Sequence, residues 1–329
     1  MVNGIINIYK EKGYTSHDVV AKMRGILKMK KIGHTGTLDP EAEGVLPVCM
    51  GKATKLVDLI TDKAKTYEAV LKLGIVTDTQ DLTGQILRTS EVTVGLSEIT
   101  EVILSYIGEY DQLPPMYSAI KVNGQRLYEL ARQGKEIERN RRRVIIKDIR
   151  ILDYSACDHE VRVSVDCGKG TYIRTLLHDI GETLGCGGAM KSLIRTRVGN
   201  FRLEEALKLA EVEELVRSEQ ISAHIIPVEA IFHNYQKITV DKEYDKLLHN
   251  GNPFRREHIK ESSQKFLPDT IQRNCAETTS IGIEGNSPNT IQGYSAKTLV
   301  RVYDSEDEFM GIYRFDYGED SYRPVKMFL

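Results

Sequence analysis

Residues 31–47 read KIGHTGTLDPEAEGVLP, a glycine-rich stretch with an Asp-Pro step at its centre. Its glycines, at positions 33, 36 and 44, permit backbone conformations that other residues resist. Pro40 biases Asp39 toward an extended conformation. An aspartate in such a loop can present its carboxylate close to a substrate. The stretch therefore predicts either a catalytic aspartate at position 39 or an Asp-Pro turn with a structural role. His34, in the same loop, suits either a phosphate contact or a hydrogen bond within the loop.

A second stretch, residues 167–181, reads CGKGTYIRTLLHDIG. A strand over residues 161–167 is expected to meet a Gly-Lys-Gly turn, and apolar residues then recur at helical spacing from Ile173. Tyr172 and Arg174 would stand at the start of this helix, where anions are favoured. Arg174 is thus a candidate anchor for a carboxylate or phosphate. The structural alternatives are an apolar plug for Tyr172 and a structural ion pair for Arg174.

The composition is that of a globular protein, with 329 residues, 41% hydrophobic content, 28% charged content and a net charge of −2. This charge argues against a protein that coats nucleic acid indiscriminately, although residues 22–31 and 126–150 are locally basic. No apolar run is long enough for a membrane helix, and the N-terminus does not resemble a signal peptide. Five scattered cysteines without a C-x-x-C pair favour neither disulfides nor zinc, and a cytoplasmic location is expected.

The order of predicted elements indicates an α+β fold with a mixed sheet and flanking helices. Strands are expected over residues 5–9, 65–74, 143–153 and 161–167, with helices after the capping signature at 15–18, from 97, over 173–184 and near 203–216. A change of character near residue 230 predicts two domains, 1–230 and 231–329. The second is expected to be small and β-rich, with strands over 237–240, 298–303 and 309–315. Residues 255–296, rich in Ser, Thr, Asn and Gln, are expected to form a flexible insertion.

The familiar cofactor signatures are missing from the sequence. Gly51-Lys52 lacks the spacing of a phosphate-binding loop, and Gly168-Lys169-Gly170 lacks the third glycine of a dinucleotide-binding turn. H-E-x-x-H and G-x-S-x-G motifs do not occur. We therefore expect neither a cofactor nor a metal ion.

Five segments, in this order along the chain, closely resemble the bacterial tRNA pseudouridine-55 synthase family. They are YKEKGYTSHDVVAKMR (9–24), KKIGHTGTLDPEAEGVLPVCMGKATKL (30–56), KTYEAVLKLGIVTDTQDLTG (65–84), PPMYSAIKVNGQRLYELARQG (114–134) and CGKGTYIRTLLHDIGETLGCGG (167–188). A weaker resemblance to the PUA-type RNA-binding module of this family lies in HNGNPF (249–254) and in residues 298–315. The resemblance implies a pseudouridine synthase catalytic domain followed by a PUA-like domain.

The resemblance also implies roles for single residues. Asp39 matches the catalytic aspartate, and Arg174 matches the arginine that pairs with it. By the same resemblance, Tyr67 would stack on the flipped uracil and Tyr172 would lie near the edge of the base. Leu193 would line the pocket, and His34 would contact the tRNA. Residues 77–84 and a thumb segment near 108–140 would grip the RNA.

The implied activity is conversion of uridine 55, in the T-loop of tRNA, to pseudouridine. The base is flipped out, and the glycosidic bond is broken and re-formed without a cofactor, in a step that depends on Asp39. The implied partner is the T-arm of tRNA, with no membrane, no obligate protein partner and a monomeric state. Two alternatives stay open: a tRNA-folding chaperone that only binds, and a guide-RNA-dependent synthase. The thumb segment favours a stand-alone enzyme over the second alternative.

Overall fold

The computed structural model describes residues 2–118, 120–122, 124–264 and 299–329. These residues divide into two compact units. One consists of Asn7–Val48 and Ile60–Ile221, and the other of Met1–Ile6, Cys49–Leu59 and Ser222–Leu329. The second unit therefore begins before the predicted boundary at residue 230, and it takes in two short segments from the N-terminal part of the chain.

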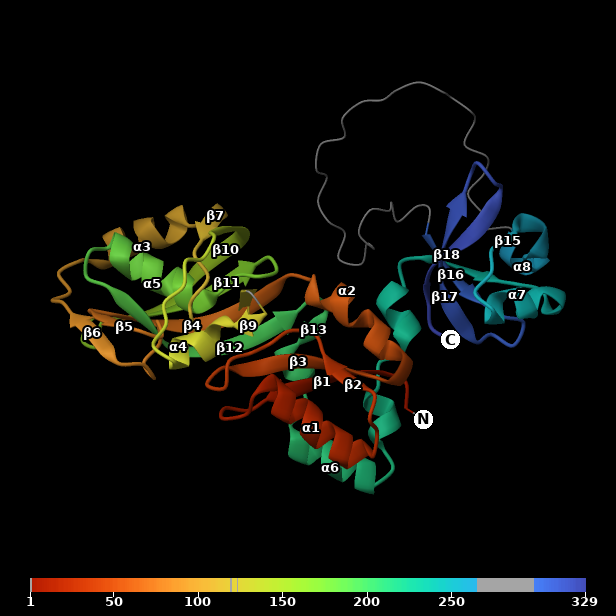
Figure 1. The fold of residues 1–329 in the computed structure, drawn as a ribbon, viewed down its shortest axis with the longest axis horizontal. Helices are drawn as coiled ribbons and strands as arrows, with labels where there is room; N and C mark the ends of the chain where they lie inside the picture. Colours follow the sequence, from red (N-terminus) through yellow and green to blue (C-terminus); the bar gives the residue numbers. More distant parts are fainter. Residues whose placement is uncertain (1, 119, 123, 265–298) are drawn as a thin grey trace. The chain divides into compact units, whose positions relative to one another are not determined.

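A mixed sheet forms the centre of the first unit, with the strand order β1-β3-β12-β4-β11-β10-β7 (Figure 1). Its strands are β1 (Gly4–Lys10), β3 (Glu43–Met50), β12 (Gly188–Val198), β4 (Lys65–Leu73), β11 (Glu160–Cys167), β10 (Arg142–Ser155) and β7 (Gly108–Gln112), with β2 (Ile32–His34) beside β3 and β13 (Phe201–Arg202) beside β12. The β12–β3 pair is parallel, whereas β4 runs antiparallel to both β12 and β11. The predicted mixed sheet is confirmed.

Alternation along β4 explains how this sheet divides its two faces. Residues at the odd positions from Lys65 to Leu73 are buried, and the residues between them are half-buried. The buried face packs with α3 (Leu96–Ser105) and α5 (Ile173–Thr183), which lie side by side over the sheet in Figure 1. The other face carries cross-strand ion pairs, such as Arg162 with Glu68 and Lys191 with Glu160. Side chains of the sheet that point toward α5 are thus packed in the hydrophobic core.

Helix α1 (Ser16–Leu27) begins where the capping signature predicts. Thr15 accepts a hydrogen bond from the backbone of Asp18, and the Asp18 carboxylate accepts one from the backbone of Thr15. Helix α6 (Leu209–Arg217) begins later than the predicted position near 203. Residues Leu203–Glu205 form a separate 3-10 turn, and Ala206 is extended, so one helix over 203–216 is wrong.

The remaining elements of the first unit are short. They are the paired strands β5 (Ile75–Thr77) and β6 (Ile86–Thr89), the paired strands β8 (Lys121–Val122) and β9 (Gln125–Arg126), and helix α4 (Leu127–Arg132).

The second unit holds a five-stranded sheet within its described residues, in the order β14-β16-β17-β18-β15. Its strands are β14 (Gln236–Thr239), β16 (Leu299–Tyr303), β17 (Phe309–Asp316), β18 (Ser321–Met327) and β15 (Phe254–Arg255), and its helices are α2 (Val57–Thr61), α7 (Asp245–His249) and α8 (Glu261–Gln264), of which α2 is shared with the first unit. A β-rich C-terminal region is thereby confirmed.

The expected insertion at 255–296 begins too early. Arg255 pairs with Ser321, residues 256–258 form a 3-10 turn, α8 follows, and Ile259 is buried. The start of the predicted insertion is therefore part of the folded unit. Residues 265–296 lie outside the described residues.

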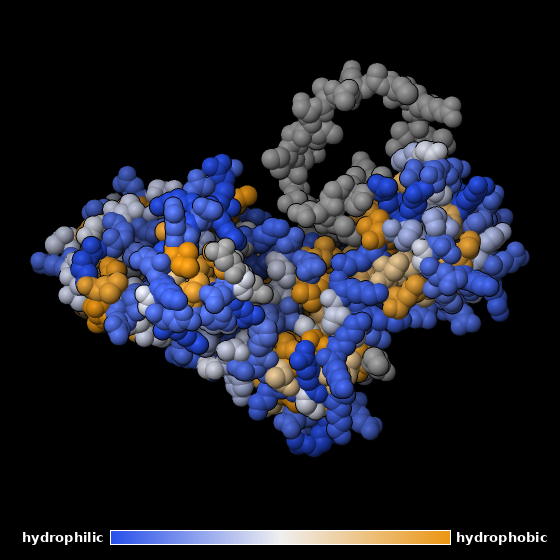
Figure 2. Space-filling model, in the orientation of Figure 1, coloured by the Kyte–Doolittle hydropathy of each residue, from blue (hydrophilic) through white to orange (hydrophobic). Residues whose placement is uncertain are grey.

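The face drawn in Figure 2 is mostly hydrophilic, with small separate apolar areas. Among the described residues, no helix is long and apolar enough to cross a membrane.

Two helical glycines differ in what surrounds them. A Cβ atom added to Gly181 in α5 would collide with the backbone of Gly187 and Gly188, whereas one added to the exposed Gly25 in α1 would meet nothing. We expect Gly181→Ala to lower the free energy of unfolding by about 1–3 kcal/mol, because the backbone cannot move aside. Gly25→Ala should raise it by up to about 1 kcal/mol through helix propensity. Urea unfolding measures both; equal effects would contradict this packing.

Candidate active site

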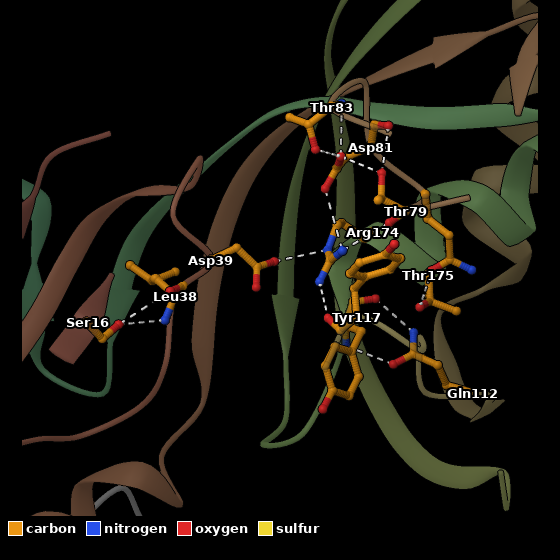
Figure 3. Close-up of polar contacts among 12 residues, drawn as sticks. Ser16, Leu38, Asp39, Thr79, Asp81, Thr83, Gln112, Tyr117, Arg174 and Thr175 are labelled. Carbon is orange, nitrogen blue, oxygen red and sulfur yellow. Dashed lines mark hydrogen bonds and ion pairs between the residues drawn. The ribbon is translucent and has the colours of Figure 1, made fainter. Parts of the chain in front are cut away.

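The loop that carries Asp39 lies between β2 and β3 and is tied down on both sides of the aspartate. The backbone N–H of Leu38 donates a hydrogen bond to Oγ of Ser16 at 2.9 Å. On the other side, Nζ of Lys10 donates to the carbonyl of Pro40 at 3.1 Å. Lys10 comes from β1 and Ser16 from α1, so two elements hold the loop (Figure 3 shows the Ser16 contact).

Lys10 is a buried cation beneath this loop. Its ammonium also donates to the carbonyls of Glu11 and Tyr14, at 3.1 and 2.6 Å. Burial lowers the pKa of Lys10 to about 8, and the nearby charge of Asp39 opposes this change. The three carbonyls replace the water molecules that the ammonium loses on burial. They therefore offset part of the desolvation cost of placing Lys10 beneath the loop.

Arg174 contacts the Asp39 carboxylate directly. Its Nε atom lies 3.0 Å from Oδ2 of Asp39, and the two side chains are 6% and 41% exposed. The same guanidinium donates to the carbonyl of Thr79 at 3.0 Å and to that of Tyr117 at 2.8 Å (Figure 3). The arginine is therefore fixed from several directions, while the carboxylate that it orients stays accessible to a ligand.

Asp81 closes the turn at residues 79–83, which also contacts Arg174. Its Oδ1 atom accepts hydrogen bonds from Oγ1 of Thr79 at 2.7 Å and from the backbone of Thr83 at 3.0 Å. Its Oδ2 atom lies 3.5 Å from Nη1 of Arg174. Asp81 lies in the segment 77–84 that was expected to grip the RNA, but it was not named individually, although Thr and Asp alternating near a glycine are typical of a turn closed by side-chain hydrogen bonds.

Tyr172 precedes helix α5 and is held through its backbone by Gln112. The Gln112 amide, which is buried, accepts from the N–H of Tyr172 at 2.7 Å and donates to its carbonyl at 2.9 Å. Burial raises the pKa of the phenol of Tyr172, and the negative charge of Asp39 adds to this rise. Tyr67, from β4, is 8% exposed, and its pKa is raised by the same two causes. The Asp39 charge therefore contributes to the raised pKa of both phenols.

Leu193 lies on β12, and His34 is the last residue of β2, directly before the Asp39 loop. Leu193 is a buried residue of β12 and pairs with Ala69 of β4. The Nδ1 atom of His34 accepts a hydrogen bond from the N–H of Gly36 at 3.3 Å, and its ring stands edge-on to that of His17 at 5.1 Å. Burial lowers the pKa of His34 to about 4, so this side chain is neutral at pH 7.

The sequence prediction also missed Arg195, a side chain of β12 that is 1% exposed. The sequence hardly marks Arg195 as a site residue, because a charged residue in a strand is usually solvent-exposed. Among the described residues, no group of three or more His, Cys, Asp or Glu side chains is placed to hold a metal ion. The arrangement offers an accessible carboxylate, buried cations around it and two aromatic rings nearby.

Comparison with known proteins bears on what this arrangement serves. Residues 24–173 match the N-terminal domain of the TruB family pseudouridylate synthases, and residues 174–233 match the tRNA pseudouridylate synthase B C-terminal domain. A curated relative from Lachnoclostridium phytofermentans, named tRNA pseudouridine synthase B, is 53% identical over 334 residues, and the alignment covers 100% of both chains. The chain belongs to the TruB family of pseudouridylate synthases.

A further TruB relative agrees with this assignment, and solved structures share the fold. A tRNA pseudouridine synthase B from Clostridium tetani is 46% identical over 312 residues, covering 94% of this chain and 95% of the relative. The fold is similar to a chain in a crystal structure of a Cbf5-Nop10-Gar1 complex, with 26% identity, a TM-score of 0.65 and coverage of 99% and 85%. A structure of an H/ACA RNP bound to a substrate RNA shares the fold at 23% identity and a TM-score of 0.64. The expected pseudouridine synthase fold is confirmed.

The low pKa of His34 predicts a dependence of stability on pH. In the unfolded chain His34 takes up a proton near its ordinary pKa of 6.5, but in the folded chain only near 4. As pH falls through this window the unfolded state binds more protons, so the folded state loses stability. His34→Gln should reduce this loss, measured by urea unfolding at several pH values. The exposed His224, changed to Gln, is the control; equal effects of the two variants would contradict the prediction.

Proposed function

We propose that this TruB chain isomerises uridine 55 in the T-loop of tRNA to pseudouridine, without a cofactor. The observation that carries the proposal is the contact of Asp39 with the buried Arg174, in a chain that belongs to a family of pseudouridylate synthases. The names of its relatives, tRNA pseudouridine synthase B, support tRNA as the substrate.

The reaction breaks the bond between N1 of the base and C1′ of the sugar, and it forms a bond between C5 and C1′. The proton on C5 is released and N1 gains one, so the step is balanced without an oxidant or reductant. Asp39 acts as the nucleophile or the base, and either role needs an ionised carboxylate. The guanidinium of Arg174 contacts this carboxylate at 3.0 Å and fixes its direction.

The target base must leave its stack to reach Asp39, which costs a few kcal/mol. Stacking on an aromatic side chain offsets part of this cost. Tyr67 is proposed for this role, because its ring stands on a central strand and lies near the Asp39 charge. Tyr172 is proposed to meet the edge of the base, and Leu193 to line the pocket.

The rest of the chain is proposed to bind the RNA around this site. His34, residues 77–84 and the thumb segment 108–140 would contact the T-arm, while residues 231–329 would act as a PUA-like module. Basic residues of the thumb and of β10, such as Arg132 and Arg142, fit a phosphate backbone. A monomer and a cytoplasmic location complete the proposal.

Replacement of Asp39 tests the proposal. With a T-arm transcript labelled with tritium at C5 of uridine, the wild-type chain should release tritium, and Asp39→Asn should abolish release without weakening RNA binding by more than about threefold, because an amide is neither nucleophile nor base here. Glu41→Gln is the matched control, since Glu41 lies in the same loop but pairs with Lys12 at the surface.

Two outcomes would count against the proposal. Binding by the wild-type chain without tritium release would favour the chaperone, or a synthase that needs a guide RNA. Full release by Asp39→Asn would leave the reaction in place but remove Asp39 from it.

A further inference from the structure

Arg195 is a buried arginine in contact with both ends of the Asp39 loop. Its Nε atom donates to the carbonyl of Val45 at 2.7 Å, and Nη2 donates to the carbonyl of Gly36 at 3.2 Å. These two carbonyls lie on opposite sides of Asp39 in the sequence. One planar guanidinium therefore fixes the distance between the two ends of the loop.

The backbone of Arg195 also meets this loop. In the parallel pair of β12 and β3, Arg195 lies opposite Gly44. Gly44 has a φ of +104°, and a Cβ atom there would collide with the carbonyl oxygen of Arg195 and lie 2.9 Å from its nitrogen. The loop thus closes tightly onto β12 at Arg195, which leaves it little freedom to shift along the strand.

The same residue lies beside Tyr67. Arg195 is opposite Tyr67 in the antiparallel pair of β12 and β4. Burial raises the pKa of Tyr67, and the positive charge of Arg195 opposes this rise. Arg195 is therefore a link between the loop of the carboxylate and the strand of the aromatic ring.

Stability alone does not account for this arginine. Its side chain is 1% exposed, and among the described residues no ion pair joins it to a carboxylate. Its donors face the main-chain carbonyls of Val45 and Gly36 and the phenol of Tyr67, all uncharged groups that compensate only part of the cost of burying a charge. An apolar side chain of similar volume would usually be at least as stable in such a place. A need to hold the two ends of the Asp39 loop in fixed positions would explain why an arginine is buried here.

We propose that Arg195 is a positioning residue that sets the place of Asp39 relative to the ring of Tyr67. The proposal rests on the proposed function, because it assigns Asp39 to the chemistry and Tyr67 to the flipped base. Arg174 orients the carboxylate itself, whereas Arg195 holds the two ends of the loop beneath it. Nothing in this role requires Arg195 to touch the RNA.

Arg195→Lys is the variant that tests this role, because lysine keeps the charge but cannot hold two carbonyls in one plane. We expect kcat for tritium release to fall about 100-fold, the effect of a misplacement of about 1 Å. KM and the dissociation constant for the T-arm transcript should stay within about threefold, because uniform binding is untouched. Rates are measured well below the melting temperature of each variant.

Arg197→Lys is the matched control. Arg197 lies on the same strand and pairs with Asp166 at 3.0 Å, but it donates to Thr66 and Gly199 and not to the Asp39 loop. Its variant should keep kcat within about threefold, as expected for a partly exposed pair. Amide hydrogen exchange supplies a second readout: exchange in residues 36–45 should accelerate in Arg195→Lys and not in Arg197→Lys.

The outcomes separate this proposal from the proposed function. An inactive wild-type chain would overturn the function. An active wild type with Arg195→Lys equally active, or with only KM changed, would overturn the role of Arg195. Should Arg195→Lys not fold, Arg195→Met is the second variant, since it leaves no buried charge. Failure of both to fold would also overturn the proposal, because Arg195 would then be required for the fold.

Discussion

The ion pair between Arg174 and Asp39 is the contact around which the first unit is organised. In the proposed reaction the carboxylate must keep one direction while an RNA nucleotide approaches it, and a loop cannot provide that rigidity alone. The guanidinium provides it because it is buried and also donates to the carbonyls of Thr79 and Tyr117. One side chain thereby joins the aspartate loop, the turn at 77–84 and the thumb segment.

The mixed sheet makes this contact possible. Its strands bring together groups that are far apart in the sequence: β1 supplies Lys10, β4 supplies Tyr67 and β12 supplies Arg195. Buried cations surround the loop and use main-chain carbonyls as partners. Their hydrogen bonds restrain the backbone of the loop on both sides of Asp39. In the proposed reaction, such preorganised groups would need little rearrangement when the substrate binds.

Much of the fold could be predicted from sequence, for identifiable reasons. The capping box at Thr15 and the alternation along β4 are local signals, and both survive in the structure. Strand β12 escaped prediction because bulges near residues 191 and 196 interrupt its alternation. The late start of α6 escaped because Ala206, a good helix former, is extended by its surroundings.

Only some residues of the candidate site could be predicted from the sequence. Asp39 and Arg174 were found because a glycine-rich loop, a helix start and a family resemblance mark them, and the structure joins them. Lys10, Gln112 and Arg195 carry no such mark. Each is a polar residue at a buried position, and its partners are main-chain groups that the sequence does not identify. Such residues become visible only when the fold brings their partners close.

Mapping of pseudouridine at nucleotide resolution tests whether Asp39, oriented by Arg174, is required to modify uridine 55 of tRNA. Unmodified tRNA is incubated with the wild-type chain or with Arg174→Gln, and pseudouridine is located by carbodiimide labelling and reverse transcription. We expect one modified position, uridine 55 of the T-loop, for the wild type. Arg174→Gln should lose that modification, because the Asp39 carboxylate loses the guanidinium that orients it. Modification at that position by Arg174→Gln at the wild-type rate would contradict this expectation.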